Sequence, residues 1–425
     1  MTNTVQLSNG MKLIFEQKAS MRSVAFGLWV RVGSVYDGDH PGIAHFIEHM
    51  IFKGNSEWDA KQIASQVDLL GAQLNAFTEK ESTCYYGRVI EEEFSSLLQM
   101  VSKIVMEPEF CREEVEKERQ VILEEIKMDL DTPDERIHDL LDAAMFDPSP
   151  YGEGILGRVH SVSHMESETL INHHKRYYRP DQMVLSIVGG GDFEDYRTLV
   201  ESVFSPYKQA QEELKAPEMG IMTPKRFVHT SKETEQLHLA MGFQLEPILA
   251  LEDRILLSIV NSYLGSSMSS RLFQEFREER GWVYAIYSYT QLFRHHAAFN
   301  IYAGFQTERM EEVLGLLEMI FQDLQTTGIS DSSVHTFKRY LKGTLAISDE
   351  SPTSRMNYLG RATLFGEPIY TSDEILAGVE ATTTEGVNGF LKKLLMQPMS
   401  LVTLGPIQED QLQSIQEHAN HLIKA

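Results

Sequence analysis

The sequence predicts an α+β protein built from two domains. Its 425 residues exceed what one ordinary hydrophobic core organises, so two or more domains are expected. A hydrophobic content of 42% and a charged content of 24% are typical of folded globular chains. Strand-like runs occur in hairpin-like pairs among helical stretches, and this mixture favours an α+β fold over a strictly alternating parallel one.

The elements can be predicted in order along the chain. Both halves open on a similar strand-like run, VAFGLWVRVGS from Val24 and QLHLAMGFQLE from Gln236, which indicates an internal duplication. Alternating residues in QLNAFTEKESTCYYGRVI predict a hairpin. Periodicity and turn residues predict helices at 59–70, 91–106 and 113–130, a loop at 146–157 and a strand at 183–191.

The boundary between the domains is expected in the stretch 208–225. This stretch is polar, lacks sustained periodicity and contains Pro217, Gly220 and Pro224. Such a composition is typical of a linker. We therefore place a linker at 211–224, between an N-terminal domain of residues 1–210 and a C-terminal domain of residues 225–425.

Charge and hydropathy exclude several classes of protein. The net charge is −24 and no block of Lys or Arg interrupts the acidic balance, so nucleic acid is not an expected partner. The N-terminal stretch has no signal-peptide pattern, and no run approaches the roughly 18 apolar residues of a membrane span. We expect a cytoplasmic protein without a membrane partner.

The stretch GIAHFIEHMIFKG, from Gly42 to Gly54, contains a candidate metal site. On a helix that turns by about 100° per residue, His45, Glu48 and His49 share one third of the circumference. Two imidazoles one turn apart can bind one Zn²⁺, and a carboxylate beside them can take a proton from water that the metal acidifies. A chance pattern is the alternative, because a catalytic zinc needs a third protein ligand.

The helix predicted at 113–130 offers that third ligand. Its apolar residues form one face, on which the helical wheel places Val115, Ile122, Leu123, Ile126 and Leu130. Glu118 and Glu125 lie at the edge of this face, whereas Glu124 lies opposite it. Glu125 is therefore a candidate ligand, and Glu118 could hold a histidine ligand through its second ring nitrogen. A solvated, charged helix with no metal role is the alternative.

Five motifs in order along nearly the whole chain resemble those of the pitrilysin/insulinase family of zinc peptidases. They are HFIEHMIFKG, NAFTEKESTCYY, ERQVILEEI, PYGEGILG and SRLFQEFREERGWVYAIYS, the first carrying the HxxEH signature of inverzincins. The chain is most similar to the branch of the mitochondrial processing peptidase and its bacterial relatives. The resemblance implies two similar α/β-roll domains, each a mixed, largely antiparallel sheet flanked by helices, which together form half of a clamshell.

The resemblance also implies roles for the residues of the metal site. His45 and His49 would be zinc ligands, and Glu125 would be the third ligand. Glu118 would support the ligands without binding the metal itself. Glu48 would be the general base. The implied function is a zinc-dependent endopeptidase that hydrolyses peptides or unfolded segments bound extended in a closed chamber. A non-catalytic scaffold or binding member of the same family is the alternative.

Substrate contacts follow from the same resemblance. Asn75, Ala76 and Phe77 match an edge strand that binds the peptide by β-augmentation. Arg277 and Tyr284 match a pair that contacts the peptide and the carbonyl under attack. Because two domains close only half a chamber, a homodimer is implied, with this pair completing the partner's site. Without the resemblance, Arg277 and Tyr284 are a surface ion-pairing residue and a packed aromatic.

Overall fold

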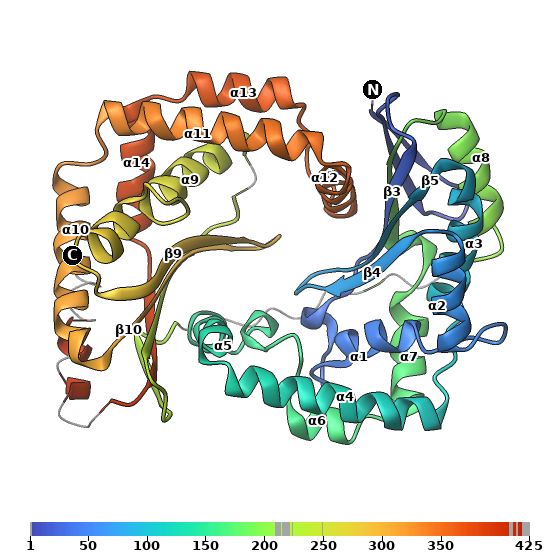
Figure 1. Cartoon of the computed structure of the whole chain (residues 1–425), viewed down its shortest axis with the longest axis horizontal. Helices are drawn as coiled ribbons and strands as arrows, with labels where there is room; N and C mark the ends of the chain where they lie inside the picture. The colour runs from blue at the N-terminus through green and yellow to red at the C-terminus, as the bar shows by residue number, and fades with distance from the viewer. Residues whose placement is uncertain are drawn as a thin grey trace. The chain divides into compact units, whose positions relative to one another are not determined.

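The computed structural model describes residues 2–208, 214, 222, 224–248, 250–407, 411–413 and 415–418 (Figure 1). These residues form two compact units. The first unit comprises Met1–Lys127, Glu153–Glu218 and Ser348–Ile369, and the second unit comprises Met128–Gly152, Met219–Ile347 and Tyr370–Ala425. The linker expected at 211–224 lies almost entirely outside the described residues. No described helix is long and apolar enough to cross a bilayer.

The first unit contains a six-stranded sheet. Its order is β1 (Thr2–Gln6), β2 (Lys12–Gln17), β6 (Met183–Gly189), β3 (Ser23–Val30), β5 (Thr83–Ile90) and β4 (Gln73–Thr78). Only β2 and β6 run parallel, and every other neighbouring pair is antiparallel. Strand β4 therefore lies at one edge of the sheet, where one side of its backbone is left without a partner strand.

The second unit contains a five-stranded sheet of the same design. Its order is β7 (Phe227–Ser231), β11 (Met399–Gly405), β8 (Leu237–Leu245), β10 (Ala297–Phe305) and β9 (Val283–Leu292), with only β7 and β11 parallel. Directions and order repeat those of β2, β6, β3, β5 and β4. The register repeats as well, because Gly27 pairs with Ser186 and Gly242 with Ser400. The predicted duplication and the α+β class are confirmed.

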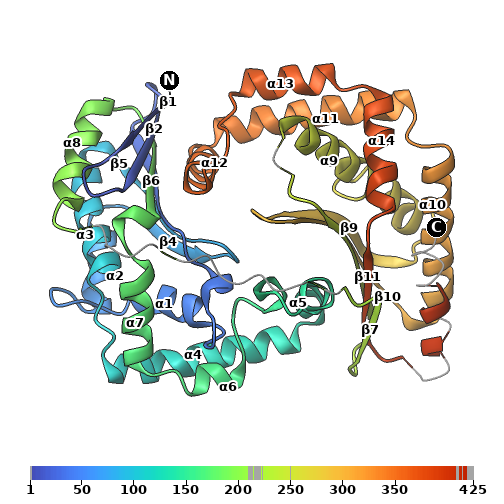
Figure 2. The same ribbon diagram turned by 180° about the vertical axis from the view of Figure 1, so that it is seen from behind.

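Helices cover both faces of each sheet. The helices that lie within the first unit are α1 (Ile43–Ile51), α2 (Ala60–Leu69), α3 (Phe94–Met106), α6 (Val159–Ser163), α7 (Ser167–Tyr177), α8 (Phe193–Phe204) and α12 (Pro352–Phe365). Those that lie within the second unit are α5 (Pro133–Phe146), α9 (Leu251–Leu264), α10 (Met310–Thr326), α13 (Ser372–Ala381) and α14 (Thr384–Leu395). Figure 2 shows α5 on one face of the second sheet and α10 and α14 on the other.

Two helices cross the boundaries between units. Helix α4 (Arg112–Asp131) begins in the first unit, and its residues from Met128 onward belong to the second; α11 (Asp331–Glu350) crosses in the opposite sense. Leu130, which the helical wheel places on the buried face, is 40% exposed. That prediction is wrong because the end of α4 has left the core of the first unit, on which Val115, Ile122 and Ile126 are buried.

Helices α5 and α12 are exchanged between the two repeats. Helix α5, from the first half of the sequence, packs on β8 and β11, and α12, from the second half, packs on β3 and β6. Glycines permit this close approach: a Cβ on Gly360 would lie 2.1 Å from Trp29 Nε1, and one on Gly242 would lie 2.3 Å from Met145 Sδ. A partly buried ion pair between Arg355 and Glu16 also attaches α12 to β2. Neither unit is therefore continuous in sequence.

Candidate metal centre

The N-terminus of α1 is fixed by backbone and side-chain contacts. The N-cap residue Gly42 has a φ of 94°, and a Cβ there would lie 2.6 Å from the carbonyl oxygen of Leu156. The buried Asp37 carboxylate accepts hydrogen bonds from the N–H groups of Gly42, at 2.6 Å, and Ala44, at 3.1 Å. Burial raises the pKa of this carboxyl well above its ordinary value, although both hydrogen bonds oppose the shift. The start of α1 is therefore tightly held.

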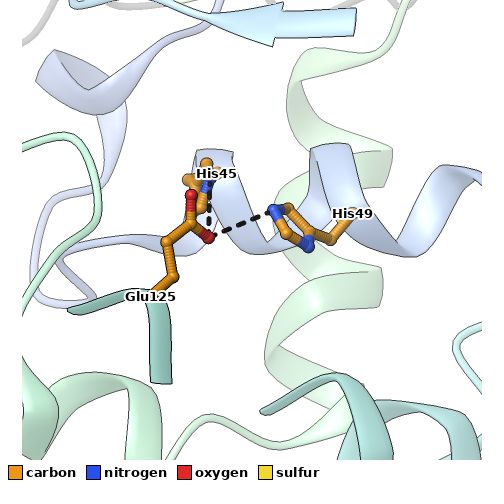
Figure 3. A group of neighbouring side chains, drawn as sticks. All are labelled: His45, His49 and Glu125. Atoms are coloured by element: carbon orange, nitrogen blue, oxygen red, sulfur yellow. Dashed lines mark ion pairs between the residues drawn. The ribbon is translucent and has the colours of Figure 1, made fainter. Parts of the chain in front are cut away.

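The three predicted metal ligands come together in the first unit. His45 and His49 lie one turn apart on α1, and Glu125 reaches them from α4 (Figure 3). Glu125 Oε2 lies 3.8 Å from His45 Nε2 and 3.6 Å from His49 Nε2. One ligand atom from each residue lies within 4.8 Å of the others. Glu124 points to solvent with its side chain 69% exposed, as the helical wheel predicts.

Glu118 supports the metal group, which consists of His45, His49 and Glu125, through a contact with His49. Its Oε1 lies 2.8 Å from His49 Nδ1, and its Oε2 lies 2.6 Å from Lys53 Nζ. Glu118 is only 4% exposed. Burial alone would raise the pKa of its carboxyl, but the His49 and Lys53 hydrogen bonds outweigh burial and lower it. The ionised carboxylate can then accept a hydrogen bond from Nδ1–H, which leaves the lone pair of His49 on Nε2, the nitrogen that faces Glu125.

The donor set fits a zinc ion. Burial, with the nearby charge of His49, lowers the pKa of His45 to about 3, so its imidazole is neutral at ordinary pH. A neutral imidazole is the form that binds a metal. Two imidazole nitrogens and one carboxylate oxygen match the three protein ligands of a catalytic zinc site, which keeps one position open.

Glu48 lies beside this group but is not one of its ligands. Its Oε2 accepts a hydrogen bond of 2.5 Å from Thr78 Oγ1. Burial raises the pKa of the Glu48 carboxyl, and the Thr78 hydrogen bond opposes that shift. A carboxyl with a raised pKa, next to a metal group that it does not bind, is suited to accepting and releasing a proton.

The predicted substrate strand is at an edge of the sheet. Asn75, Ala76 and Phe77 lie in β4, which pairs only with β5 among the described strands. Asn75 is exposed, and its side-chain oxygen accepts the N–H of Ala76 at 2.8 Å. The Phe77 ring packs edge-on against the Trp29 ring, with 5.6 Å between the ring centroids, and this contact attaches β4 to the interior of the sheet. The position of these residues is as predicted, and their peptide contacts stay a prediction.

Arg277 and Tyr284 belong to the second unit. Arg277 is exposed in the π-helical turn Phe273–Glu278 and forms no ion pair with the residues that the structure describes. Tyr284 is 73% exposed, so it is not a packed aromatic. Val283 pairs with Phe305 and Ala285 with Gly304, which leaves Tyr284 as the extra residue of a β-bulge. Bulges redirect side chains and are frequent next to active sites.

Tyr284 also lines an open hollow of about 950 Å³ in the second unit. Tyr287 and Tyr302 form part of its wall, and His138 from α5 contacts the Tyr287 hydroxyl at 2.9 Å. Sequence reasoning missed this hollow because its walls come from β8, β9, β10, the end of α4, the start of α5 and the loop 232–236, which are distant in the chain.

Three further residues at the metal group were also missed: Asp37, Lys53 and Thr78. Each contacts α1 or α4 from a different element. Lys53 and Thr78 do lie inside the motifs HFIEHMIFKG and NAFTEKESTCYY, but their spacing carries no sign of these contacts. For Lys53 and Thr78 their presence in the motifs was the available signal, and Asp37 lies in none of the motifs.

Comparisons with known proteins agree with a metal site in this chain. Residues 12–158 match the family model described as Insulinase (Peptidase family M16), and residues 164–341 match the model described as Peptidase M16 inactive domain. Uncharacterized zinc protease YmxG of Bacillus subtilis is 35% identical over 405 residues, which are 94% of this chain and 97% of the relative. The chain belongs to peptidase family M16. The resemblance to the pitrilysin/insulinase family is thereby confirmed.

Another relative and two solved structures agree with this assignment. An uncharacterized zinc protease of Mycobacterium tuberculosis is 34% identical over 404 residues, covering 94% of this chain and 92% of the relative. The peptidase M16 inactive domain from Pseudomonas fluorescens has a TM-score of 0.88 at 21% identity, covering 96% of this chain and 98% of its own. A protease from Helicobacter pylori also has a TM-score of 0.88, at 18% identity, with coverage of 96% and 99%. The two structures show the shared fold.

Proposed function

We propose that this family M16 chain is a zinc-dependent endopeptidase. The observation that carries the proposal is the convergence of His45, His49 and Glu125 from two helices to within 4.8 Å, with Glu48 left beside them. The relatives named zinc proteases support it, since they match nearly the whole chain. His45, His49 and Glu125 would hold the zinc ion, and Glu118 would fix the orientation of His49.

Bound zinc would supply Lewis-acid chemistry, polarising the scissile carbonyl and acidifying water. The residues of the chain would do the rest. Glu48 takes the proton of the attacking water on its carboxylate and later delivers it to the leaving amine. The backbone of Asn75, Ala76 and Phe77 binds the peptide as an added strand, which holds the scissile bond in place with little dependence on sequence.

Arg277 and Tyr284 would act on the substrate from a second copy of the chain. The exposed Tyr284 hydroxyl donates a hydrogen bond to the oxyanion that develops during attack, and Arg277 binds a peptide carbonyl. This arrangement makes the enzyme a homodimer with two equivalent sites. A heterodimer with a degenerate partner would need only one such pair.

A single substitution tests the chemistry. Glu48→Gln removes the proton acceptor but no metal ligand, so zinc should stay bound while cleavage of a mixed peptide library, read by mass spectrometry, is lost. Glu124→Gln, on the solvent side of α4, is the matched control and should leave both zinc and cleavage unchanged. Unimpaired cleavage by Glu48→Gln would remove Glu48 from the mechanism.

Subunit mixing tests the dimer. Glu48→Gln and Tyr284→Phe each disable the proposed site in a different subunit. Randomly exchanged dimers of the two variants should regain about a quarter of wild-type activity, because half of the dimers are mixed and each mixed dimer has one intact site. No recovery, in dimers shown to exchange, would place both residues in the site of a single chain.

A second candidate is a non-catalytic binding member of the family. The observation that favours it is the match of residues 164–341 to a model described as an inactive domain. The metal group lies outside that match, in the residues that match the Insulinase model. Zinc content after dialysis separates the candidates, since a scaffold would retain no stoichiometric zinc and cleave no peptide.

A further inference from the structure

Thr78 is the last residue of the edge strand β4 and contacts the carboxylate of Glu48. We propose that Thr78 is a positioning residue that holds the Glu48 general base in its working orientation. This inference rests on the proposed function, because it assigns a role to Thr78 through Glu48. Thr78 is not a metal ligand, so the inference adds a residue that serves catalysis and not zinc binding.

The contact is specific to one oxygen of the carboxylate. Thr78 Oγ1 donates to Glu48 Oε2 at 2.5 Å, and among the described residues it is the only hydrogen-bond donor to this carboxylate. Oε1 therefore stays free to accept a proton. A half-buried carboxylate with a single donor can rotate about its terminal torsion once the donor is removed, because that torsion has broad minima. One hydroxyl thus determines which oxygen is fixed and which one reacts.

The donor itself is rigid. Thr78 pairs with Thr83 of β5, whose buried hydroxyl donates to the carbonyl of Val32 at 2.8 Å. The hairpin turn is closed by the Glu79 N–H and the Ser82 carbonyl at 2.8 Å, and a Cβ on Gly33 would lie 2.1 Å from the Glu79 carbonyl. A β-branched side chain also has few χ1 rotamers. The hydroxyl is therefore presented from a fixed backbone.

Thr78 directly follows the residues proposed to bind peptide. Asn75, Ala76 and Phe77 belong to the same strand, so the backbone that aligns the peptide also carries the hydroxyl that aligns the base. Distances between the scissile bond and Glu48 would then depend on one rigid element. Precise placement of this kind determines the rate of the chemical step rather than substrate affinity.

The test compares hydroxyl-deleting and hydroxyl-retaining variants. Thr78→Val keeps the shape and strand preference of threonine but removes the donor, and Thr78→Ala is a second deletion. Both should lower kcat by about 10- to 100-fold, the usual effect of losing one hydrogen bond to a charged group. KM should change by less than about twofold, and zinc content should be unchanged. Thr78→Ser retains a donor and should keep kcat within about threefold of wild type.

The control makes the same substitution elsewhere on the sheet. Thr4 is exposed on β1, at the opposite edge, so Thr4→Val should leave kcat and KM unchanged. The inference is overturned if kcat of both deletion variants equals that of Thr4→Val. It is also overturned if KM rises while kcat holds, which would indicate a role in strand structure, or if Thr78→Ser is as slow as Thr78→Val.

Glu48→Gln distinguishes this inference from the proposed function. Full activity of Glu48→Gln would refute the general base, and with it both ideas. An inactive Glu48→Gln beside a fully active Thr78→Val would refute the role of Thr78 and leave the endopeptidase mechanism intact.

Discussion

Replacing Glu118 by Gln tests how far the zinc affinity depends on a residue that contacts a metal ligand but does not itself bind the metal. The Glu118 carboxylate divides its oxygens between His49 Nδ1, at 2.8 Å, and Lys53 Nζ, at 2.6 Å. Glutamine has one acceptor oxygen and one NH₂ group. If the oxygen stays on His49, the NH₂ group faces the Lys53 ammonium, and if the amide flips, two donors face each other at His49.

The expected loss follows from these contacts. Glu118 is 4% exposed, so water does not readily replace the missing acceptor. Substituting a hydrogen-bond partner of a metal ligand typically weakens metal binding by about 10- to 100-fold, which corresponds to about 1.4–2.8 kcal/mol of binding free energy. A single hydrogen bond to a charged group falls in a similar range, about 1.5–3 kcal/mol. We therefore expect Glu118→Gln to bind zinc about 10- to 100-fold more weakly while its fold is retained.

Competition with a chromophoric chelator measures the zinc dissociation constant directly. Glu124→Gln is the control, because Glu124 lies on the same helix, is exposed and pairs only with Lys127 at 2.7 Å among the described residues. Its zinc affinity should equal that of the wild type. An unchanged dissociation constant for Glu118→Gln would refute the idea that Glu118 holds His49 for the metal.

Three further predictions concern packing, catalysis and pH. Gly360→Ala places a Cβ 2.1 Å from Trp29 Nε1 and should lower the free energy of unfolding by about 1–3 kcal/mol, measured by urea denaturation. Tyr284→Phe removes an exposed hydroxyl and should lower kcat by about 100- to 1000-fold without changing the melting temperature. Burial lowers the pKa of His296 from 6.5 to about 4, so the unfolded chain binds this proton more readily. The stability linked to His296 is complete above pH 6.5 and is lost as the pH falls toward 4, by up to about 3 kcal/mol. His296→Phe should therefore make the urea midpoint of unfolding depend less on pH between 6.5 and 4.

Each of these predictions has a control and an outcome that contradicts it. Gly343→Ala, on α11 with open space around the new Cβ, should be neutral or stabilising by up to about 1 kcal/mol, and equal effects of the two alanines would contradict the packing argument. A Tyr284→Phe enzyme of normal kcat would remove the hydroxyl from the reaction. A His296→Phe variant with the wild-type dependence on pH would show that other groups cause the acid sensitivity.

The residues of the metal group could largely be predicted from the sequence because their geometry is local. His45, Glu48 and His49 lie within one turn of a helix, and helical periodicity fixes their directions before any tertiary contact is known. The same periodicity separates Glu125 from Glu124, because one borders the apolar face of α4 and the other does not. That Glu125 reaches α1 required the tertiary structure, since no pattern reports the distance between two helices.

The sequence by itself determined several of the elements, the α+β class, the duplication and the side chains able to bind a metal, because these depend on short-range periodicity and side-chain chemistry. Only the tertiary structure decided which helix covers which sheet, as the exchange of α5 and α12 shows. It also decided that Thr78 contacts Glu48, that Lys53 shares Glu118 with His49, and that a bulge exposes Tyr284. Such contacts join residues far apart in the chain, and their formation depends on packing complementarity across the whole fold rather than on any local preference.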